Sequence, residues 1–435
     1  MSKRIYLDYA SVTPVDSAVS KEVLRVSKKH TANPSSIYME GVKAGEFLES
    51  CRKRTADFLE VHSDEIIFTS GGTESNALAI KGVIEGYKNS LGSVSAEILG
   101  GNSKIDRFSV NFVNGAEIFA EKSEMPNDSH NVPHIISSTI EHPSVKELLL
   151  VFEKSGEIEL SLISPNEEGI VEAAKIAESL RPNTILVSVM YANNEIGTIM
   201  PISTIAKKLR EYKKEQGRTE FEMPFLHTDA SQAVAYLPMR VPSLHADLLT
   251  MDGGKVYGPR GVGALFVKRI VPFKSITEGG SQEKGRRAGT ENLPGIAGFA
   301  LALEMVAKNK DKEAKRVATL RDLLLVNLKS SEIGKRFTIN GTMVEGERLP
   351  NNLNICIPEI DAEFLVLTLD AMGLCVSSVT SCRTLSEDSY SYVVQEVSGS
   401  DCSKSSLRIT LGKYTTKGEI LRAGKMIVEG LLLNF

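Results

Sequence analysis

Residues 251–265 read MDGGKVYGPRGVGAL and carry one lysine, Lys255, between a pair of glycines and a turn rich in glycine and proline. The apolar run at 264–267 predicts a buried strand directly after that turn. Glycines beside a lysine let the backbone approach a bound group closely, which makes Lys255 a candidate for a lysine held at a site. Taken alone, this stretch is more typical of a solvated lysine in a loop, so the case for a site has to come from the rest of the chain.

The strands predicted before this stretch share one feature, a polar side chain where each strand ends. Helical patterns such as 202–214 separate them, and the predicted strands are residues 65–69, 134–138, 184–190, 224–227 and 247–251. This alternation indicates an α/β fold with a mostly parallel sheet covered by helices on both faces. The carboxyl ends of such strands share one edge of the sheet, where open α/β folds bind their ligands.

The first of these strands runs into SGGTESNALAIKG, residues 70–82. Gly72 and Thr73 are expected at the N-terminus of the following helix, where exposed N–H groups and the helix dipole favour an anion such as phosphate. The alternative is a capped helix without a ligand, because Ser and Thr cap helices in any case.

Two later strand ends carry titratable groups. His142 follows strand 134–138 and precedes Pro143, which is favoured in the first turn of a helix. It is either a ligand-binding side chain or a packed, capping one. Asp229 follows strand 224–227, where a buried carboxylate needs a cationic or N–H partner to stay ionised. It could hold a heteroaromatic ring nitrogen protonated, or it could cap the next helix.

The composition is that of an ordinary soluble enzyme. The 435 residues carry a net charge of -4, 42% are hydrophobic and 24% are charged, so no basic excess favours nucleic acid. Neither a signal peptide nor an apolar run of the ~20 residues that a membrane span needs is expected, which favours the cytoplasm. Five cysteines lack metal-site spacing and are expected to be free thiols in a reducing compartment: Cys51, Cys356, Cys375, Cys382 and Cys402.

The length predicts two domains. A large sheet domain is expected up to about residue 310, with a surface insertion at about 87–132 that contains a hairpin near 108–112. Residues 311–435 are expected to form a smaller α+β domain, because strand and helix patterns alternate there without a long parallel series. Separate helices are predicted on the two sides of the boundary, at 296–308 and 310–329.

Nine motifs in sequence order resemble the cysteine desulfurases of the class V aminotransferase group, the fold-type I enzymes that use pyridoxal 5′-phosphate (PLP). They read SGGTES, IEHPSV, NNEIGT, HTDASQ, GGKVYGPRGVGAL, GGSQEKGRRAGTEN, LPNNLNI, SSVTSC and SLRITLGKYTT. The likeness runs from residue 6 to about 420. It implies a large PLP-binding domain at 15–310 and a small domain in which 1–14 join 311–435 and the loop that carries Cys382.

Around the cofactor, the resemblance implies one covalent bond and several polar contacts. Lys255 matches the lysine that forms the Schiff base with PLP, and Asp229 matches the partner of the pyridine nitrogen. Gln232 matches the hydrogen bond to the phenolic oxygen, and His142 matches the imidazole stacked on the ring. The implied phosphate ligands are Gly72 and Thr73 of this chain, together with Thr290 lent by the other subunit of a homodimer.

The substrate implied by the resemblance is L-cysteine, which becomes L-alanine. Asn194 and Arg408 match the residues that hold the amino acid, with Arg408 clamping its carboxylate. Cys382 matches the nucleophile, whose thiolate takes the sulfur as a persulfide. The sulfur then passes to an acceptor protein such as an iron-sulfur scaffold, or into tRNA thiolation. Lys255, freed during the reaction, is the expected proton shuttle.

Several positions depart from the family pattern. Asp252 and Gly254 stand where Ser-x-His-Lys normally supplies two phosphate donors, which places a carboxylate near a dianion. Tyr38 stands at the family's histidine after NPSS, and Val379–Ser381 replace Gly-Ser-Ala before the cysteine. Two alternatives therefore stand beside a desulfurase. One is a non-catalytic relative acting as a binding or scaffold protein, and the other is a PLP lyase or aminotransferase on another amino acid.

Overall fold

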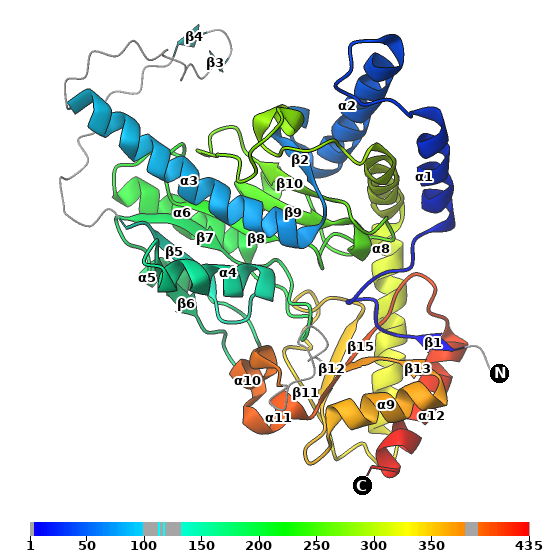
Figure 1. Ribbon diagram of the computed structural model, residues 1–435. Coiled ribbons are helices and arrows are strands. Elements are labelled where there is room, and N and C mark those ends of the chain that lie inside the picture. Colours follow the sequence, from blue (N-terminus) through cyan, green and yellow to red (C-terminus); the bar gives the residue numbers. More distant parts are fainter. Residues whose placement is uncertain (1–3, 99–111, 114–115, 118–131, 379–389, 435) are drawn as a thin grey trace.

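The computed structural model describes residues 4–98, 112–113, 116–117, 132–378 and 390–434. Among these residues, seven strands form the central sheet in the order β2-β10-β9-β8-β7-β5-β6. β10 is antiparallel to β2 and β9, and the other neighbours are parallel. The predicted fold is confirmed (Figure 1). The strand bounds are β2 Ile66–Thr69, β5 His134–Ser138, β6 Glu159–Ile163, β7 Thr184–Ser188, β8 Phe225–Asp229, β9 Leu248–Asp252 and β10 Gly263–Val267.

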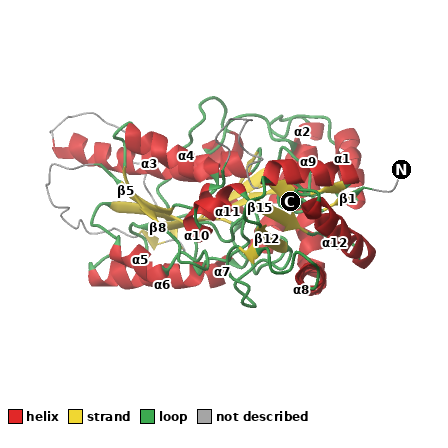
Figure 2. Cartoon of the chain, turned by 90° about the horizontal axis from the view of Figure 1, so that it is seen from below, coloured by secondary structure: helices red, strands yellow, loops and turns green. Residues whose placement is uncertain are grey.

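Helices cover both faces of this sheet, as Figure 2 shows. α3 and α4 lie on one face, and α5, α6 and α7 lie on the other. Two N-terminal helices, α1 and α2, pack against α8. The bounds of these helices are α1 Ser17–Lys29, α2 Met39–Leu59, α3 Gly72–Ile98, α4 Pro143–Lys154, α5 Ala173–Glu178, α6 Ile202–Glu215, α7 Val241–Leu244 and α8 Leu293–Lys329.

Consecutive apolar residues in the strands explain these two helical layers. Ile135 packs in one hydrophobic core with residues of α3, whereas Ile136 packs in another with residues of α5 and α6. Leu186 and Val187 on β7 divide in the same way. Because a strand points successive side chains to opposite faces, an uninterrupted apolar strand is stable only between two covering layers.

α8 differs from the prediction, because it is one continuous helix where the sequence predicts two. Its charged middle, residues 308–313, contains neither glycine nor proline to end a helix. Phe299 in its first half packs in the core of the central sheet, and Leu324 in its second half packs in the core of the C-terminal region. Position 311 therefore lies inside a helix that both regions share.

The C-terminal region contains an antiparallel sheet in the order β11-β12-β15-β14. The N-terminal strand β1 (Ile5–Tyr6) pairs in parallel with β13 (Leu374–Cys375), and Thr410 N donates to Leu7 O at 2.8 Å. Residues 5–7 thus lie beside the last third of the chain. The other bounds are β11 Thr338–Ile339, β12 Asn352–Cys356, β14 Ser377–Ser378, β15 Ser406–Thr410, α9 Ala362–Met372, α10 Tyr392–Ser398, α11 Ser400–Lys404 and α12 Lys417–Leu432.

The insertion predicted at 87–132 starts later than expected, because α3 continues to Ile98. A short hairpin is present as β3 (Phe112–Val113) and β4 (Ala116–Glu117), whereas residues 108–111 of the stretch where the sequence predicts one lie outside the described ranges, as do most others of the insertion. Within the described part of the chain, no helix has the length and apolar character to cross a membrane.

The expectation of free cysteines is wrong for two of them. Cys356 on β12 and Cys402 on α11 form a disulfide, with their Cα atoms 5.2 Å apart. Cys356 lies opposite Ser406 in the β12–β15 pair, and Ser406 Oγ donates to Cys402 O at 2.6 Å. The register of these strands brings the two cysteines together, and cysteine spacing along the chain does not reveal it. Cys51 and Cys375 are free thiols.

Candidate active site

The strand ends meet at one edge of the central sheet and enclose a cavity of about 450 Å³. β8 and β9 supply Asp229 and Asp252, and the turn after β9 supplies Lys255. Arg408 enters from β15 of the C-terminal region. The structure thus gathers most of the predicted site residues in one place. The other lining residues are Asp8, Ala10, Ser11, Gly72, Thr73, Asn76, His142, Ser144, Met190, Ala192, Asn194, Ser231 and Gln232.

One part of the wall, here called the Asp229 end, consists of Asn76, His142, Ser144 and Asp229. Asp229 Oδ2 accepts from Asn76 Nδ2 at 2.7 Å, and Oδ1 accepts from Ser231 N at 2.9 Å. The helix that the sequence predicts directly after Asp229 is absent, because residues 231–236 form turns, so the contact with Ser231 N closes a turn and caps no helix. Both of these donors are neutral, so they orient the carboxylate without cancelling its charge, and that charge is available to a protonated group in the cavity.

His142 caps the N-terminus of α4. Its Nδ1 accepts from Ser144 N at 3.2 Å and lies 2.8 Å from Ser144 Oγ, while Pro143 occupies the first turn. Burial lowers the pKa of His142, and the neighbouring Asp229 carboxylate opposes that shift. The ring is therefore neutral at neutral pH and forms a flat, uncharged part of the wall.

Glu141 is a buried residue at this end that the sequence did not single out. Its Oε1 accepts from Ser138 Oγ at 2.7 Å and from Met190 N at 3.0 Å. Its Oε2 has no partner among the described residues. Burial raises the pKa of Glu141 to about 8, so the carboxyl group is mostly protonated at neutral pH. Its place beside His142, directly after a buried strand, was the only signal for it in the sequence.

Lys255 is held by the N-terminal segment. Its Nζ donates to Ala10 O at 2.8 Å and to Ser11 O at 2.5 Å. Gln232 Nε2 donates to the same Ala10 carbonyl at 2.9 Å. The position of the amine therefore depends on residues that are far from it in sequence, and no local sequence pattern indicates these contacts.

Arg408 reaches the cavity although only 5% of the residue is exposed. Its Nη2 donates to Asp8 Oδ1 at 2.9 Å and to Ser11 Oγ at 2.7 Å, and Nη1 donates to Asn194 O at 3.1 Å. Its Nε is buried and has no acceptor in the described part of the chain. A guanidinium fork matches the geometry of a carboxylate, so this arrangement suits a carboxylate ligand.

A second part of the wall, here called the Asp252 end, consists of Gly72, Thr73, Ser231 and Asp252, and Gly254 is hydrogen-bonded to it. Asp252 Oδ2 accepts from Gly72 N at 2.8 Å, at the first residue of α3, and Oδ1 accepts from Gly254 N at 2.7 Å. A Cβ on Gly72 would lie 3.2 Å from Asp252 Oδ2, so a side chain there would crowd the carboxylate. The helix N-terminus thus holds an anion, as its dipole favours, and that anion belongs to the chain itself.

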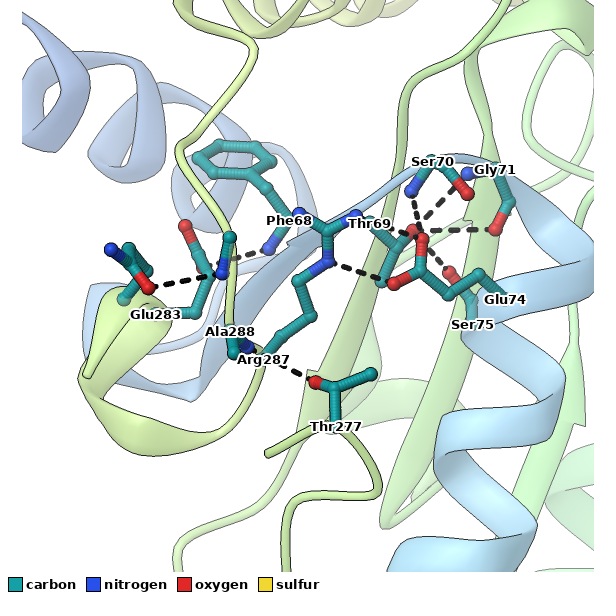
Figure 3. Close-up of polar contacts among 12 residues, drawn as sticks. Phe68, Thr69, Ser70, Gly71, Glu74, Ser75, Thr277, Glu283, Arg287 and Ala288 are labelled. Atoms are coloured by element: carbon teal, nitrogen blue, oxygen red, sulfur yellow. Dashed lines mark hydrogen bonds and ion pairs between the residues drawn. The ribbon is translucent and has the colours of Figure 1, made fainter. Parts of the chain in front are cut away.

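The loop before α8 is anchored beside the start of α3, as Figure 3 shows. Arg287 Nε donates to Glu74 Oε1 at 2.8 Å, and Phe68 N on β2 donates to Glu283 Oε2 at 2.8 Å. The sequence did not reveal these long-range pairs. Thr290 lies on this loop, is exposed, and does not line the cavity of its own chain.

Cys382 lies outside the described residues, but the chain on both sides of its loop is placed. Ser377 on β14 pairs with Arg408 on β15. After the loop, Ser391 Oγ donates to Glu195 Oε2 at 2.5 Å. The last described residues before the loop, Ser377 and Ser378, therefore lie beside the strand that carries the cavity's guanidinium group.

Known proteins with similar sequences indicate the family to which this chain belongs. The profile described as Aminotransferase class-V matches residues 5–94 and 120–422. A cysteine desulfurase IscS of Dictyoglomus turgidum is 36% identical over 424 residues, which cover 97% of this chain and 92% of the relative. The chain belongs to the class V cysteine desulfurases. Another cysteine desulfurase, IscS 1 of Archaeoglobus fulgidus, is 34% identical and covers 96% of this chain and 94% of its own length.

Solved structures of related proteins share the fold over almost the whole chain of this class V desulfurase. A NifS-like protein superposes with a TM-score of 0.79 at 27% identity, covering 99% of this chain and 100% of that one. A NifS-like protein from Rickettsia africae has a TM-score of 0.75 at 27% identity and covers 98% of both chains. SspA, solved in complex with cysteine, has a TM-score of 0.69 at 26% identity and covers 95% of this chain and 100% of its own.

Class V cysteine desulfurases use PLP, and the two parts of the wall fit that cofactor unequally. The Asp229 end fits its ring, because a carboxylate, a neutral imidazole and the side chain of Asn76, whose Oδ1 has no partner among the described residues, line the same cavity. The Asp252 end fits less well, because a carboxylate already accepts from N–H groups that a phosphate would use.

Proposed function

We propose that this chain is a PLP-dependent cysteine desulfurase that converts L-cysteine to L-alanine in the cavity of about 450 Å³. The observation that carries the proposal is that Arg408, Lys255 and Asp229 line one cavity. They offer a clamp for a carboxylate, an amine that can bond to an aldehyde, and an anion for a ring nitrogen. Bound PLP would supply the electron sink that lets the α-proton of an amino acid leave.

Different residues of this chain are proposed to contact the ring, the phosphate and the substrate carboxylate. Asp229 is proposed to keep the pyridine nitrogen protonated, with His142 along the ring and Gln232 on the phenolic oxygen. Gly72 and Thr73 would meet the phosphate at the start of α3. Because Arg408 is oriented by Asp8, Ser11 and the Asn194 carbonyl, it can fix the substrate carboxylate with little reorganisation.

The sulfur transfer is proposed to use Lys255 and Cys382. Lys255 Nζ would carry the proton that leaves the substrate Cα. The Cys382 thiolate would attack the substrate sulfur, so that the C–S bond breaks, an S–S bond forms, and the Cβ of the product alanine takes up a proton. The persulfide sulfur would then pass to an acceptor protein of iron-sulfur cluster assembly or tRNA thiolation, in the cytoplasm.

The enzyme is further proposed to act as a homodimer. Ile37 is 96% exposed and Met39 is 65% exposed at the start of α2, with Tyr38 and Val42 also exposed beside them. A cluster of exposed apolar side chains favours burial against another protein surface. Thr290 would complete the phosphate site of the second copy. Sedimentation should give a dimer, and Ile37→Asp combined with Met39→Asp should shift it toward the monomer.

Product analysis tests the reaction. Purified protein supplied with PLP and L-cysteine should release alanine, with a matching amount of enzyme-bound persulfide or of sulfide when a thiol is added. Cys382→Ser should abolish this release, whereas Cys375→Ser, which changes a free thiol on β13, should not. Alanine formation that does not need Cys382 would point to another PLP reaction. No visible absorbance dependent on Lys255 would point to a non-catalytic binding or scaffold protein.

A further inference from the structure

Asp252 takes two backbone donors at the place where the cofactor phosphate is expected. Its carboxylate oxygens lie 2.8 Å from Gly72 N and 2.7 Å from Gly254 N. Gly72 is the first residue of α3, so Asp252 also takes the positive end of that helix dipole. A phosphate that enters here has to share these donors with a negative charge or displace it.

A second observation at the Asp252 end is a buried hydroxyl group that lacks a hydrogen-bond partner among the described residues. The atom is Ser231 Oγ, which is shielded from solvent. It lies 3.1 Å from the point where a Cβ of Gly72 would stand, close to the Asp252 carboxylate. A buried hydroxyl without a partner is costly, so it favours a ligand oxygen beside the start of α3.

We propose that Asp252 sets the cofactor specificity of this enzyme by acting as an internal substitute for part of the phosphate. Because the carboxylate repels a phosphate dianion and competes for the Gly72 and Gly254 amides, the chain gains less affinity from the phosphate of PLP than the cradle could provide. Unphosphorylated pyridoxal carries no charge at that position and avoids this conflict. The inference rests on the proposed PLP-dependent function and concerns one determinant of cofactor affinity.

The test compares two aldehydes on the full-length protein after removal of bound cofactor. PLP and pyridoxal are titrated into the natural protein, Asp252→Asn and Asp252→Ser, and the Lys255-dependent visible absorbance gives each dissociation constant. Asp252→Asn keeps the shape of the side chain. Asp252→Ser keeps an oxygen that can accept from Gly254 N. Because each variant preserves a different feature of Asp252, at least one of the two variants is expected to fold. Glu85→Gln, on α3 but paired with Lys88 at 3.1 Å, makes the same change in net charge away from the cavity.

Removal of the carboxylate should tighten PLP binding by about 10- to 100-fold and leave pyridoxal binding unchanged. Inorganic phosphate should raise the melting temperature of the cofactor-free Asp252 variants more than that of the natural protein or Glu85→Gln, because a ligand of the folded state stabilises it.

Three results would overturn the inference. They are equal PLP affinity with and without the carboxylate, a parallel gain for pyridoxal, and no added stabilisation by phosphate in the Asp252 variants. If neither aldehyde produces Lys255-dependent absorbance in any variant, the proposed function fails as well. The two failures are therefore distinguishable.

Discussion

Asp229 and Asp252 end two neighbouring parallel strands and face the same cavity, but their donors differ. Asp229 is oriented by the side-chain amide of Asn76 at 2.7 Å and by one backbone N–H, from Ser231, at 2.9 Å. Asp252 accepts from two backbone N–H groups, one of them at the first residue of α3. A helix N-terminus partly neutralises a carboxylate, whereas a side-chain amide mainly positions it. A strand end therefore places each carboxylate in the site, and its donors decide how it acts on a ligand: Asp229 attracts a protonated group, whereas Asp252 competes with an anion for N–H donors.

The largest effect expected is the loss of function in Lys255→Ala. The residues at both ends of the cavity are proposed to contact PLP, and Lys255 is the residue that would bond to it. Loss of proton transfer alone should lower alanine formation by about 10²- to 10⁴-fold. The visible absorbance of bound PLP should disappear with it. Lys208→Ala on α6, which removes an amine paired with Glu211 at 2.8 Å, is the control and should behave like the natural enzyme. Retained activity in Lys255→Ala would refute the proposed role of this cavity.

The next effect separates the two carboxylates directly. Asp229→Asn should lower kcat by about 10²- to 10³-fold, because the ring nitrogen loses the anion that keeps it protonated. Asp252→Asn should leave kcat at saturating PLP near its natural value, since that carboxylate acts on cofactor affinity. Steady-state kinetics with excess PLP measures both variants. Equal losses of kcat in the two variants would show that the two carboxylates do not act on different steps.

The parts of the fold and site that the sequence revealed are those set by local pattern. Apolar strands followed by polar residues predicted the sheet and the edge at which Asp229, His142 and Lys255 meet. The helix start after Gly-Gly-Thr predicted an anion at Gly72. Both signals lie within a few residues of the atoms concerned, and family resemblance added the roles of Arg408 and Asn194.

The features that escaped prediction depend on contacts between distant segments. The Cys356–Cys402 disulfide follows from the pairing of β12 with β15, and α8 is continuous because each half packs in a different core. The hydrogen bonds from Lys255 to the carbonyl groups of Ala10 and Ser11 join residues that are separated by more than half of the chain. The sequence placed a carboxylate near the phosphate, but only the structure shows Asp252 accepting from Gly72 N.

A smaller effect is expected for Arg408, the positively charged residue that is proposed to bind the substrate carboxylate in the same cavity as Asp229 and Asp252. Arg408→Lys keeps the charge but loses the fork, and a charged hydrogen bond contributes about 1.5–3 kcal/mol. KM for L-cysteine should therefore rise by about 10- to 100-fold, with little change in the absorbance of bound PLP. Arg240→Lys, in a surface pair with Glu60 at 2.6 Å, serves as the matched control. An unchanged KM would mean that the substrate carboxylate is held elsewhere.

The smallest effect concerns whether Asp229 is the only full negative charge at its end. Burial raises the pKa of Glu141 from 4.5 to about 8, so the fold favours the protonated acid. The stability from this proton is complete below the unfolded pKa of Glu141 and is lost as the pH rises through the folded value of about 8.

Glu141→Gln carries no such proton, so its free energy of unfolding should fall less with rising pH. The difference in free energy of unfolding between the variant and the natural protein should change by about 1–2 kcal/mol between pH ~6 and ~8. Urea denaturation across that pH range measures it. Parallel pH profiles would show that Glu141 is already ionised in the fold. The Asp229 end would then carry two negative charges, and the contrast with the Asp252 end would rest on hydrogen bonding alone.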